Sequence, residues 1–307
     1  MQKQLWEDPK VIKINKEDGH VIAMPFDNVD SAISGEESKY KKSLNGEWKF
    51  YWQRGLENQP QNFEKPEFND KEWDNITVPS VWQTEGYSVP YYYASTFPRA
   101  ISRSKHKIPS IDHKMQEIGF YRKSFTLDDS WKKREIFIHF GAAKAALEVF
   151  VNGTFVGYSQ GSMTPHEFDI SKYVKFGEEN IVCAKVYRYS DGTYLEDQDM
   201  WWLCGIYREV YLFAESPVCL RDFFFRTKLD NYYKDAEIDL DLYINNYAGL
   251  KGNVTAEAHL ISDTGREFPI AEKTVPLGIN KTTISMKSEM KNPKKWSAEH
   301  PNLYTLV

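Results

Sequence analysis

The chain has 307 residues, a length that suggests about two domains at roughly 100–200 residues each. Hydrophobic residues make up 41% of the chain and aromatic residues 15%, which is enough for a full core. The net charge is -5, with no long block of one sign, and this argues against a nucleic-acid-binding surface.

The three cysteines, Cys183, Cys204 and Cys219, are odd in number, and no spacing among them suits zinc. No stretch approaches the roughly 20 apolar residues of a membrane helix, and residues 1–17 contain no apolar run of signal-peptide length. We therefore predict a chain in a reducing compartment, the cytoplasm, with no membrane partner.

The first 42 residues are polar and irregular, with few apolar positions. Such an arm is ordered only if it docks on another part of the protein. From Leu44 onward, apolar and other residues alternate, and we expect strands at 46–52, 135–140, 147–151, 154–158, 181–189 and 207–213. Asn152 and Gly153 predict a tight hairpin turn, because a type I′ turn needs positive φ at both central residues.

A boundary is predicted near 214–217, and the alternation beyond it is very regular. Residues 235–245 and 253–261 place Ile, Leu, Val and Ala at every second position. Turn residues separate these segments at short intervals, a pattern typical of a small antiparallel sandwich with one solvated face per sheet. Sustained helical periodicity is absent, so we predict an all-β chain. Its last residues, 304–307, have the pattern of a strand interrupted in its middle.

An acidic segment holds Glu196, Asp197 and Asp199, followed by Met200 and two tryptophans. Three close carboxylates repel one another unless solvent, cations or hydrogen-bond donors stabilise them. Carboxylates beside exposed aromatic rings are typical of a sugar site, since the carboxylates accept hydroxyl hydrogen bonds and a ring packs on the apolar sugar face. The alternative is that these carboxylates cap backbone amides and that the tryptophans belong to the core.

Several segments resemble the β-galactosidases of glycoside hydrolase family 2. They are LNGEWKF (44–50), VPSVWQ (78–83), FVNGTFVGY (150–158), SDGTYLEDQDMW (190–201) and WSAEHPNLY (296–304). The resemblance implies an arm (1–42), a jelly-roll sugar-binding domain (43–216) and an immunoglobulin-like β-sandwich (217–307) truncated in its last strand. It also implies that a (β/α)₈ barrel carries the two catalytic carboxylates of a retaining hydrolase acting on terminal β-galactosides such as lactose.

By this resemblance, the chain alone contains no catalytic residue. Asp199 corresponds to a residue at the mouth of the barrel that binds a galactose hydroxyl and an alkali-metal ion, Na⁺ or K⁺, with further ligands from the barrel. Tyr92 corresponds to an aromatic residue near the entrance. Trp202, also expected to contact substrate, stands where Arg is more common, so the leaving-group preference would differ. Ala94 replaces a substrate-binding Asn. Glu196 and Asp197 are expected to be structural.

The resemblance also implies a divalent cation site for Mg²⁺, formed by Asp8, Gln160 and Asp191 with the carbonyl of Val11, since such cations prefer oxygen ligands. A further acidic ligand of the family would fall at Leu5, which cannot serve, so the site is weakened. Asp191 precedes Gly192 and is alternatively a plain turn residue. The full-length enzyme would be a homo-oligomer. Two other functions stay open: a free-standing carbohydrate-binding module and a purely structural scaffold.

Overall fold

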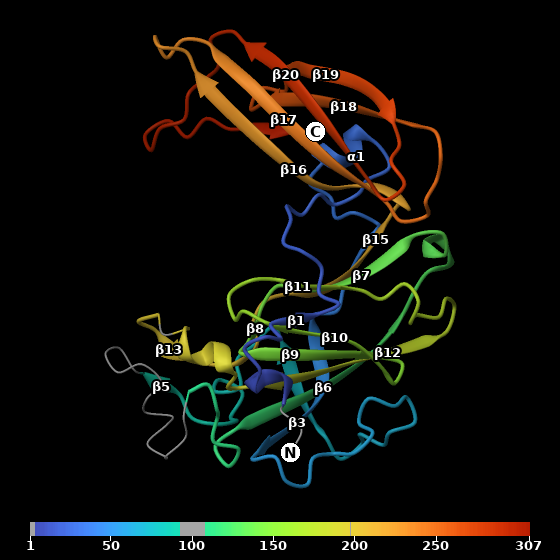
Figure 1. Ribbon diagram of the computed structural model, residues 1–307, viewed down its shortest axis with the longest axis vertical. Coiled ribbons are helices and arrows are strands. Elements are labelled where there is room, and N and C mark those ends of the chain that lie inside the picture. The colour runs from blue at the N-terminus through green and yellow to red at the C-terminus, as the bar shows by residue number, and fades with distance from the viewer. Residues whose placement is uncertain (1–3, 93–107, 197) are drawn as a thin grey trace. The chain divides into compact units, whose positions relative to one another are not determined.

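The computed structural model describes residues 4–92, 108–196 and 198–307 (Figure 1). Strands account for 47% of the chain and helices for 5%, so the prediction of an all-β protein is confirmed. The chain divides into two compact units, Met1–Asp18 with Lys41–Ala214 and Gly19–Tyr40 with Glu215–Val307. Among the described residues, no helix is both long enough and apolar enough to cross a membrane.

The first unit is a sandwich of two antiparallel sheets with two small ribbons at its side. The seven-stranded sheet has the order β1 (Lys13–Ile14), β10 (Thr154–Gln160), β9 (Ala146–Val151), β12 (Glu179–Tyr187), β6 (Glu117–Thr126), β3 (Gly46–Arg54) and β4 (Asp74–Val78). The four-stranded sheet has the order β11 (His166–Asp169), β7 (Glu135–Phe140), β15 (Val210–Glu215) and β2 (Lys41–Ser43). The ribbons pair β13 (Trp201–Trp202) with β5 (Tyr91–Tyr92), and β14 (Gly205–Ile206) with β8 (Ala143–Lys144).

The alternation in the sequence gives these strands their buried faces. Ile136 and Ile138 of β7 and Leu147 and Val149 of β9 are all fully buried. The turn from β9 to β10 has positive φ at both predicted residues, 49° at Asn152 and 82° at Gly153, and β9, β10 and β12 lie side by side in Figure 1. In the described part of the chain, short 3₁₀ helices interrupt the loops at η1 (Leu5–Glu7), η3 (Asp129–Trp131) and η4 (Asp191–Tyr194).

The described part of the N-terminal arm docks on other segments of the chain, but it does not form one body. Its first part packs on the first unit, where Trp6 of η1 is 1% exposed and β1 pairs with β10 to form the edge of the seven-stranded sheet. Its second part, with the short helix α1 (Val29–Ile33), belongs to the second unit. There Ile22, Met24 and Phe26 line an apolar groove together with β17 and β18.

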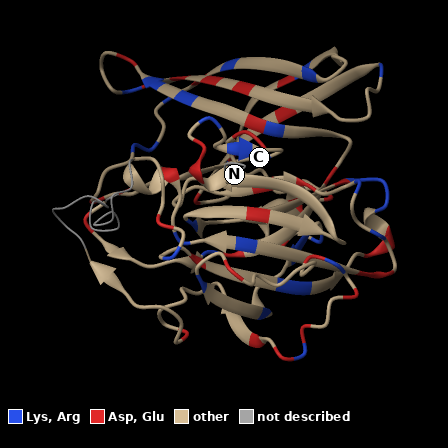
Figure 2. Cartoon of the chain, turned by 60° about the horizontal axis from the view of Figure 1, so that its bottom comes forward, with Lys and Arg blue, Asp and Glu red and all other residues tan. Residues whose placement is uncertain are grey.

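The second unit is a sandwich of two three-stranded antiparallel sheets, as the immunoglobulin-like prediction requires. One sheet has the order β16 (Val218–Leu229), β17 (Ala236–Asn246) and β20 (Lys281–Met290), and the other β19 (Glu267–Pro276), β18 (Asn253–Ser262) and β21 (Tyr304–Leu306). Its core contains Ile238, Leu240, Leu242 and Ile244, which alternate along one face of β17. The residues between them carry charge or face solvent, and Figure 2 shows charges of both signs interspersed along the strands.

Candidate functional site

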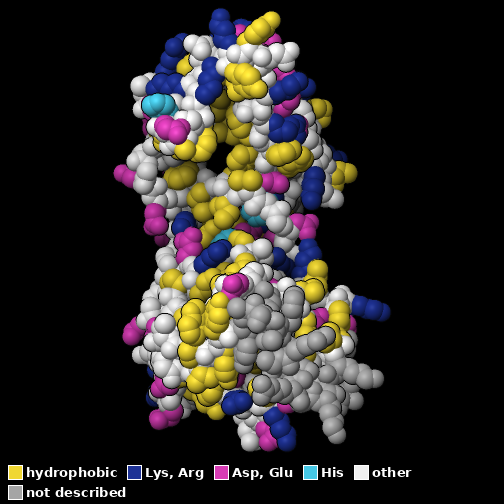
Figure 3. Space-filling model, turned by 90° about the vertical axis from the view of Figure 1, so that its left-hand side faces the viewer, with side chains coloured by type: hydrophobic (Ala, Val, Ile, Leu, Met, Phe, Trp, Pro, Cys, Tyr) yellow, Lys and Arg dark blue, Asp and Glu magenta, His cyan; other side chains and the backbone are white. Residues whose placement is uncertain are grey.

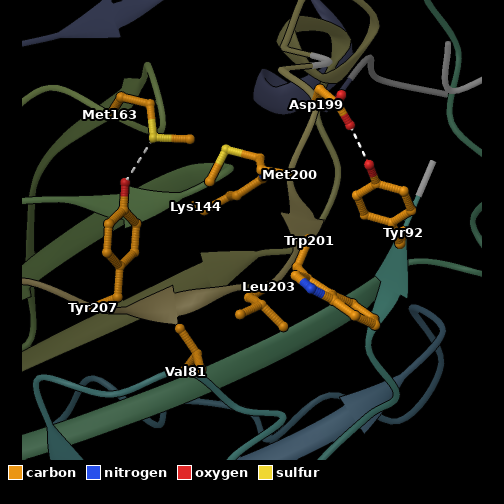
Figure 4. Close-up of a pocket in the computed structure, with 9 residues that line it drawn as sticks. All are labelled: Val81, Tyr92, Lys144, Met163, Asp199, Met200, Trp201, Leu203 and Tyr207. Atoms are coloured by element: carbon orange, nitrogen blue, oxygen red, sulfur yellow. Dashed lines mark hydrogen bonds between the residues drawn. The ribbon is translucent and has the colours of Figure 1, made fainter. Parts of the chain in front are cut away.

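An open hollow of about 550 Å³ lies beside the ribbon of β5 and β13 in the first unit. Figure 3 shows hydrophobic side chains exposed on this face of the molecule. The hollow is lined by Val81, Tyr92, Lys144, Met163, Asp199, Met200, Trp201, Leu203 and Tyr207, all drawn in Figure 4. A mostly apolar hollow of this size with a few polar groups suits a small ligand.

Asp199 and Tyr92 approach each other at the rim of the hollow. Trp201 pairs with Tyr92 and Trp202 with Tyr91 across the ribbon, which brings the acidic segment beside β5. The Tyr92 hydroxyl donates a hydrogen bond to Oδ1 of Asp199 (Figure 4). That hydrogen bond raises the pKa of Tyr92, because the carboxylate stabilises the protonated phenol.

The two tryptophans of β13 have different environments. Trp201 is 55% exposed, and its ring centroid lies 5.7 Å from that of Tyr92. Trp202, predicted to contact substrate, is only 4% exposed and packs in the core, where the ammonium of Lys144 lies 4.7 Å from its ring centroid. The ring that a ligand can reach is therefore that of Trp201. Side chains of successive strand residues point to opposite faces of the strand. The prediction chose the neighbouring residue in β13, and therefore the buried ring of Trp202 instead of the exposed ring of Trp201.

Glu196 has a structural partner, as expected. Its carboxylate accepts a hydrogen bond from the backbone N–H of Ser162 at 2.8 Å and another from the Ser162 hydroxyl. The Tyr207 hydroxyl donates to the carbonyl of the same Ser162. These bonds fix the loop that brings Met163 to the hollow. Asp197 and Ala94 lie outside the described residues.

The predicted divalent site is only partly assembled. Gln160 and Asp191 lie together, but the Gln160 side-chain amide donates its N–H to Oδ1 of Asp191 at 2.6 Å and also to the Tyr158 hydroxyl at 2.7 Å. Asp8 ends η1, which packs against η4, where Asp191 lies. In the part of the chain that the structure describes, no three His, Cys, Asp or Glu side chains are grouped to hold a metal. Because Gln160 presents its amide nitrogen to Asp191, this amide would have to turn before these residues could hold a cation together.

Comparisons with known proteins cover nearly the whole chain. The family "Glycosyl hydrolases family 2, sugar binding domain" matches residues 41–216, and "Glycosyl hydrolases family 2" matches residues 218–307. A protein of Priestia megaterium named beta-galactosidase is 38% identical over 304 residues, and one of Streptococcus thermophilus with the same name is 33% identical over 301. Each alignment covers 98% of this chain but only 29% and 28% of the relative, so the chain spans less than a third of their length.

Solved structures agree on the fold. A beta-glucuronidase of Bacteroides uniformis superposes with a TM-score of 0.69 at 21% identity, covering 87% of this chain and 29% of that one. A beta-glycosidase of Bacteroides vulgatus gives 0.63 at 23% identity, covering 87% and 31%. With two adjoining family matches over the two sandwiches, the chain belongs to glycoside hydrolase family 2.

Proposed function

We propose that this chain is the non-catalytic, sugar-binding part of a retaining β-galactosidase that hydrolyses terminal β-D-galactose residues of lactose-type substrates. The observation that carries the proposal is the hollow, where one carboxylate, Asp199, stands beside an exposed ring, Trp201. Retaining hydrolysis uses two carboxyl groups roughly 5–5.5 Å apart. Among the described residues, Asp199 is the single carboxylate that lines the hollow. The bond-breaking pair would then come from a (β/α)₈ barrel in the complete protein.

In this proposal Asp199 accepts a hydrogen bond from a galactose hydroxyl and offers one ligand to Na⁺ or K⁺. A carboxylate has about four acceptor sites, and the hydrogen bond from Tyr92 uses one of them. Trp201 would pack against the apolar face of the sugar, a role that its exposure favours over Trp202. The apolar lining, including Val81 and Leu203, would contact the barrel. The complete enzyme would be a homo-oligomer, and Mg²⁺ between Asp8, Gln160 and Asp191 would require the Gln160 amide to turn.

Two measurements test this function. The 307-residue chain, incubated with a chromogenic β-galactoside, should release no product, and robust cleavage would contradict the proposal. In the complete enzyme, Asp199→Ala should raise KM and lower kcat/KM, because a substrate contact is lost. Glu57→Ala, which removes an exposed carboxylate from another loop of the same unit, is the matched control and should leave both constants unchanged. Unchanged constants in Asp199→Ala would favour a purely structural scaffold.

The second candidate is a free-standing carbohydrate-binding module, which is favoured by an exposed tryptophan and a carboxylate on one rim. Titration of the isolated chain with galactose and lactose distinguishes the two functions. Binding at millimolar concentration or below that is lost in Trp201→Ala would favour the module. Absence of binding by the isolated chain, with normal binding by the complete enzyme, would favour a site shared with the barrel.

A further inference from the structure

The ribbon that carries the hollow is too small to hold its own position. β5 and β13 have two residues each and form two residue pairs, and Tyr92 and Trp201 are 50% and 55% exposed. An isolated pair of strands is marginally stable in water even when it is longer. Other contacts must therefore fix the ribbon, and with it the approach of Tyr92 to Asp199.

One buried guanidinium contacts both sides of the ribbon. Arg188 is 1% exposed, and its Nη2 donates hydrogen bonds to the carbonyl oxygen of Val89 at 3.0 Å and to that of Trp202 at 3.2 Å. Its Nη1 also donates to the Ser88 hydroxyl, and its Cζ lies 4.7 Å from the centroid of the Tyr91 ring. The backbone that leads into β5 and the backbone of β13 are thus joined through a single side chain.

The same guanidinium is fixed to the large sheet of the first unit. Arg188 Nη1 lies 2.9 Å from each carboxylate oxygen of Glu117, the first residue of β6, and the Glu117 side chain is 5% exposed. The backbone N–H of Arg188 also donates to the Glu117 carbonyl at 2.9 Å. β6 lies inside the seven-stranded sheet between β12 and β3, so Glu117 is a rigid anchor.

We propose that Arg188, anchored by Glu117, is a positioning residue that sets the place of the β5–β13 ribbon and thereby holds Tyr92 against Asp199. A guanidinium suits this task because its planar fork offers five donors in fixed directions, whereas a lysine ammonium is a compact charge on a flexible stem. The contribution of this ribbon placement to sugar binding rests on the proposed function. The position of the ribbon can be measured without any sugar.

The chain offers a matched control in Arg122. This guanidinium is also buried, at 3% exposed, and also joins a carboxylate to two backbone carbonyls. It donates to Asp70 at 2.8 Å, to the Lys65 carbonyl at 3.0 Å and to the Phe63 carbonyl, all in the loop between β3 and β4. Arg122→Lys therefore removes equivalent contacts at a site that does not touch β5 or β13.

The experiment compares Arg188→Lys, Arg122→Lys and the unmodified 307-residue chain by amide hydrogen exchange and by ¹⁹F NMR after 3-fluorotyrosine labelling. Tyr92→Phe assigns the Tyr92 signal. In Arg188→Lys, the backbone amides of residues 88, 89, 91, 92 and 201–203 should exchange about tenfold faster than in the unmodified chain, because hydrogen bonds to a charged group are lost. The pKa of Tyr92, which Asp199 raises, should fall. In Arg122→Lys, exchange should rise near 63–70 and leave the Tyr92 signal unchanged.

Unaltered exchange and an unaltered Tyr92 pKa in Arg188→Lys would overturn the proposal. So would an equal loosening of the ribbon in Arg122→Lys, since the ribbon would then respond to any loss of stability. If Arg188→Lys does not fold, Glu117→Gln replaces it, because this variant keeps the guanidinium and removes the charge of its anchor. Hydrogen exchange and the Tyr92 pKa are measured without a galactoside. A failure of galactoside binding would therefore contradict the proposed function and leave the positioning role of Arg188 unaffected.

Discussion

The hydroxyl of Tyr92 donates a hydrogen bond to the carboxylate of Asp199, although 107 positions separate the two residues in the sequence. Both side chains reach solvent at the rim of the hollow. Because solvent also stabilises an exposed carboxylate, the fold does not depend on this pair. Asp199 is therefore a residue whose chemistry is available to a ligand.

Replacing Asp199 with Asn should change the chemistry of Tyr92 without changing stability. Asp199 raises the pKa of Tyr92, so this pKa should fall when the negative charge is removed. The pKa is obtained from phenolate absorbance, by comparing the Asp199→Asn chain with a variant that also carries Tyr92→Phe. The midpoint of urea denaturation should be unchanged. An unaltered Tyr92 pKa, or a large loss of stability, would contradict the pairing.

Glu196→Ala should loosen the loop that carries Met163. The Glu196 carboxylate accepts two hydrogen bonds from Ser162, which is fully buried, so its removal leaves buried donors without a charged partner. We expect a loss of about 1.5–3 kcal/mol of stability. Hydrogen exchange at the Ser162 amide should rise, while the amides of β12 stay protected. As a comparison, Asp128→Ala removes the carboxylate that caps Ser130 in another loop and should leave Ser162 protected.

Much of the strand pattern could be predicted from the sequence because burial on one face leaves a period of two. The strand predicted at 135–140 has the same bounds as β7 (Glu135–Phe140). The alternating residues of 235–245 fall in β17 (Ala236–Asn246). The central strand β6 was not among the expected strands. Arg122 lies in it and is buried because Asp70 and two carbonyls surround its guanidinium. Partners that are distant in sequence cannot be read from local alternation.

The sequence allows prediction of those features of the candidate site that depend on the residue types themselves. The acidic segment and Tyr92 do meet in the structure, and Glu196 has a structural partner. The exposed tryptophan is Trp201 rather than Trp202, since the faces of a two-residue ribbon depend on packing that no sequence period reveals. Arg188 could not be predicted from the sequence either, because its role depends on the carbonyls of Val89 and of Trp202 in β13 and on the carboxylate of Glu117.

Trp6→Ala should release the first part of the arm. Trp6 is 1% exposed, and its ring centroid lies 5.6 Å from that of Tyr187 and 5.4 Å from that of His113. Loss of such a buried ring costs about 3–5 kcal/mol. Limited proteolysis should then cut within residues 4–18, with a lower midpoint of thermal unfolding. Ile12→Ala, in the same segment but 62% exposed, should resist cleavage as the unmodified chain does.

The thiols of Cys183 and Cys204 should react with iodoacetamide at pH 8 only after unfolding. Burial raises the pKa of Cys183 to about 12 and that of Cys204 to about 11, and the thiolate is the reactive form. Mass spectrometry of the alkylated native chain should find both residues unmodified. The same chain unfolded in about 8 M urea is the control and should be modified at both. Fast modification of the native chain would contradict their burial.

His166 should make the fold less stable as the pH falls. The imidazole is fully buried and lies 2.7 Å from the Ser159 hydroxyl, and burial lowers its pKa from 6.5 to about 3. Between these two values the unfolded chain binds a proton that the folded chain does not. The contribution to stability is therefore fully present above pH 6.5 and decreases as the pH falls toward 3, by up to about 1.4 kcal/mol per pH unit.

Urea denaturation of the unmodified chain and of His166→Gln at several pH values checks this expectation. Carboxylates also titrate in this range, so the informative quantity is the difference between the two free energies of unfolding. That difference should be constant above pH 7, which serves as the internal control, and should shift in favour of His166→Gln as the pH falls below 6.5. Two parallel curves across the whole range would mean that the folded chain accommodates a protonated His166, against its burial beside Ser159.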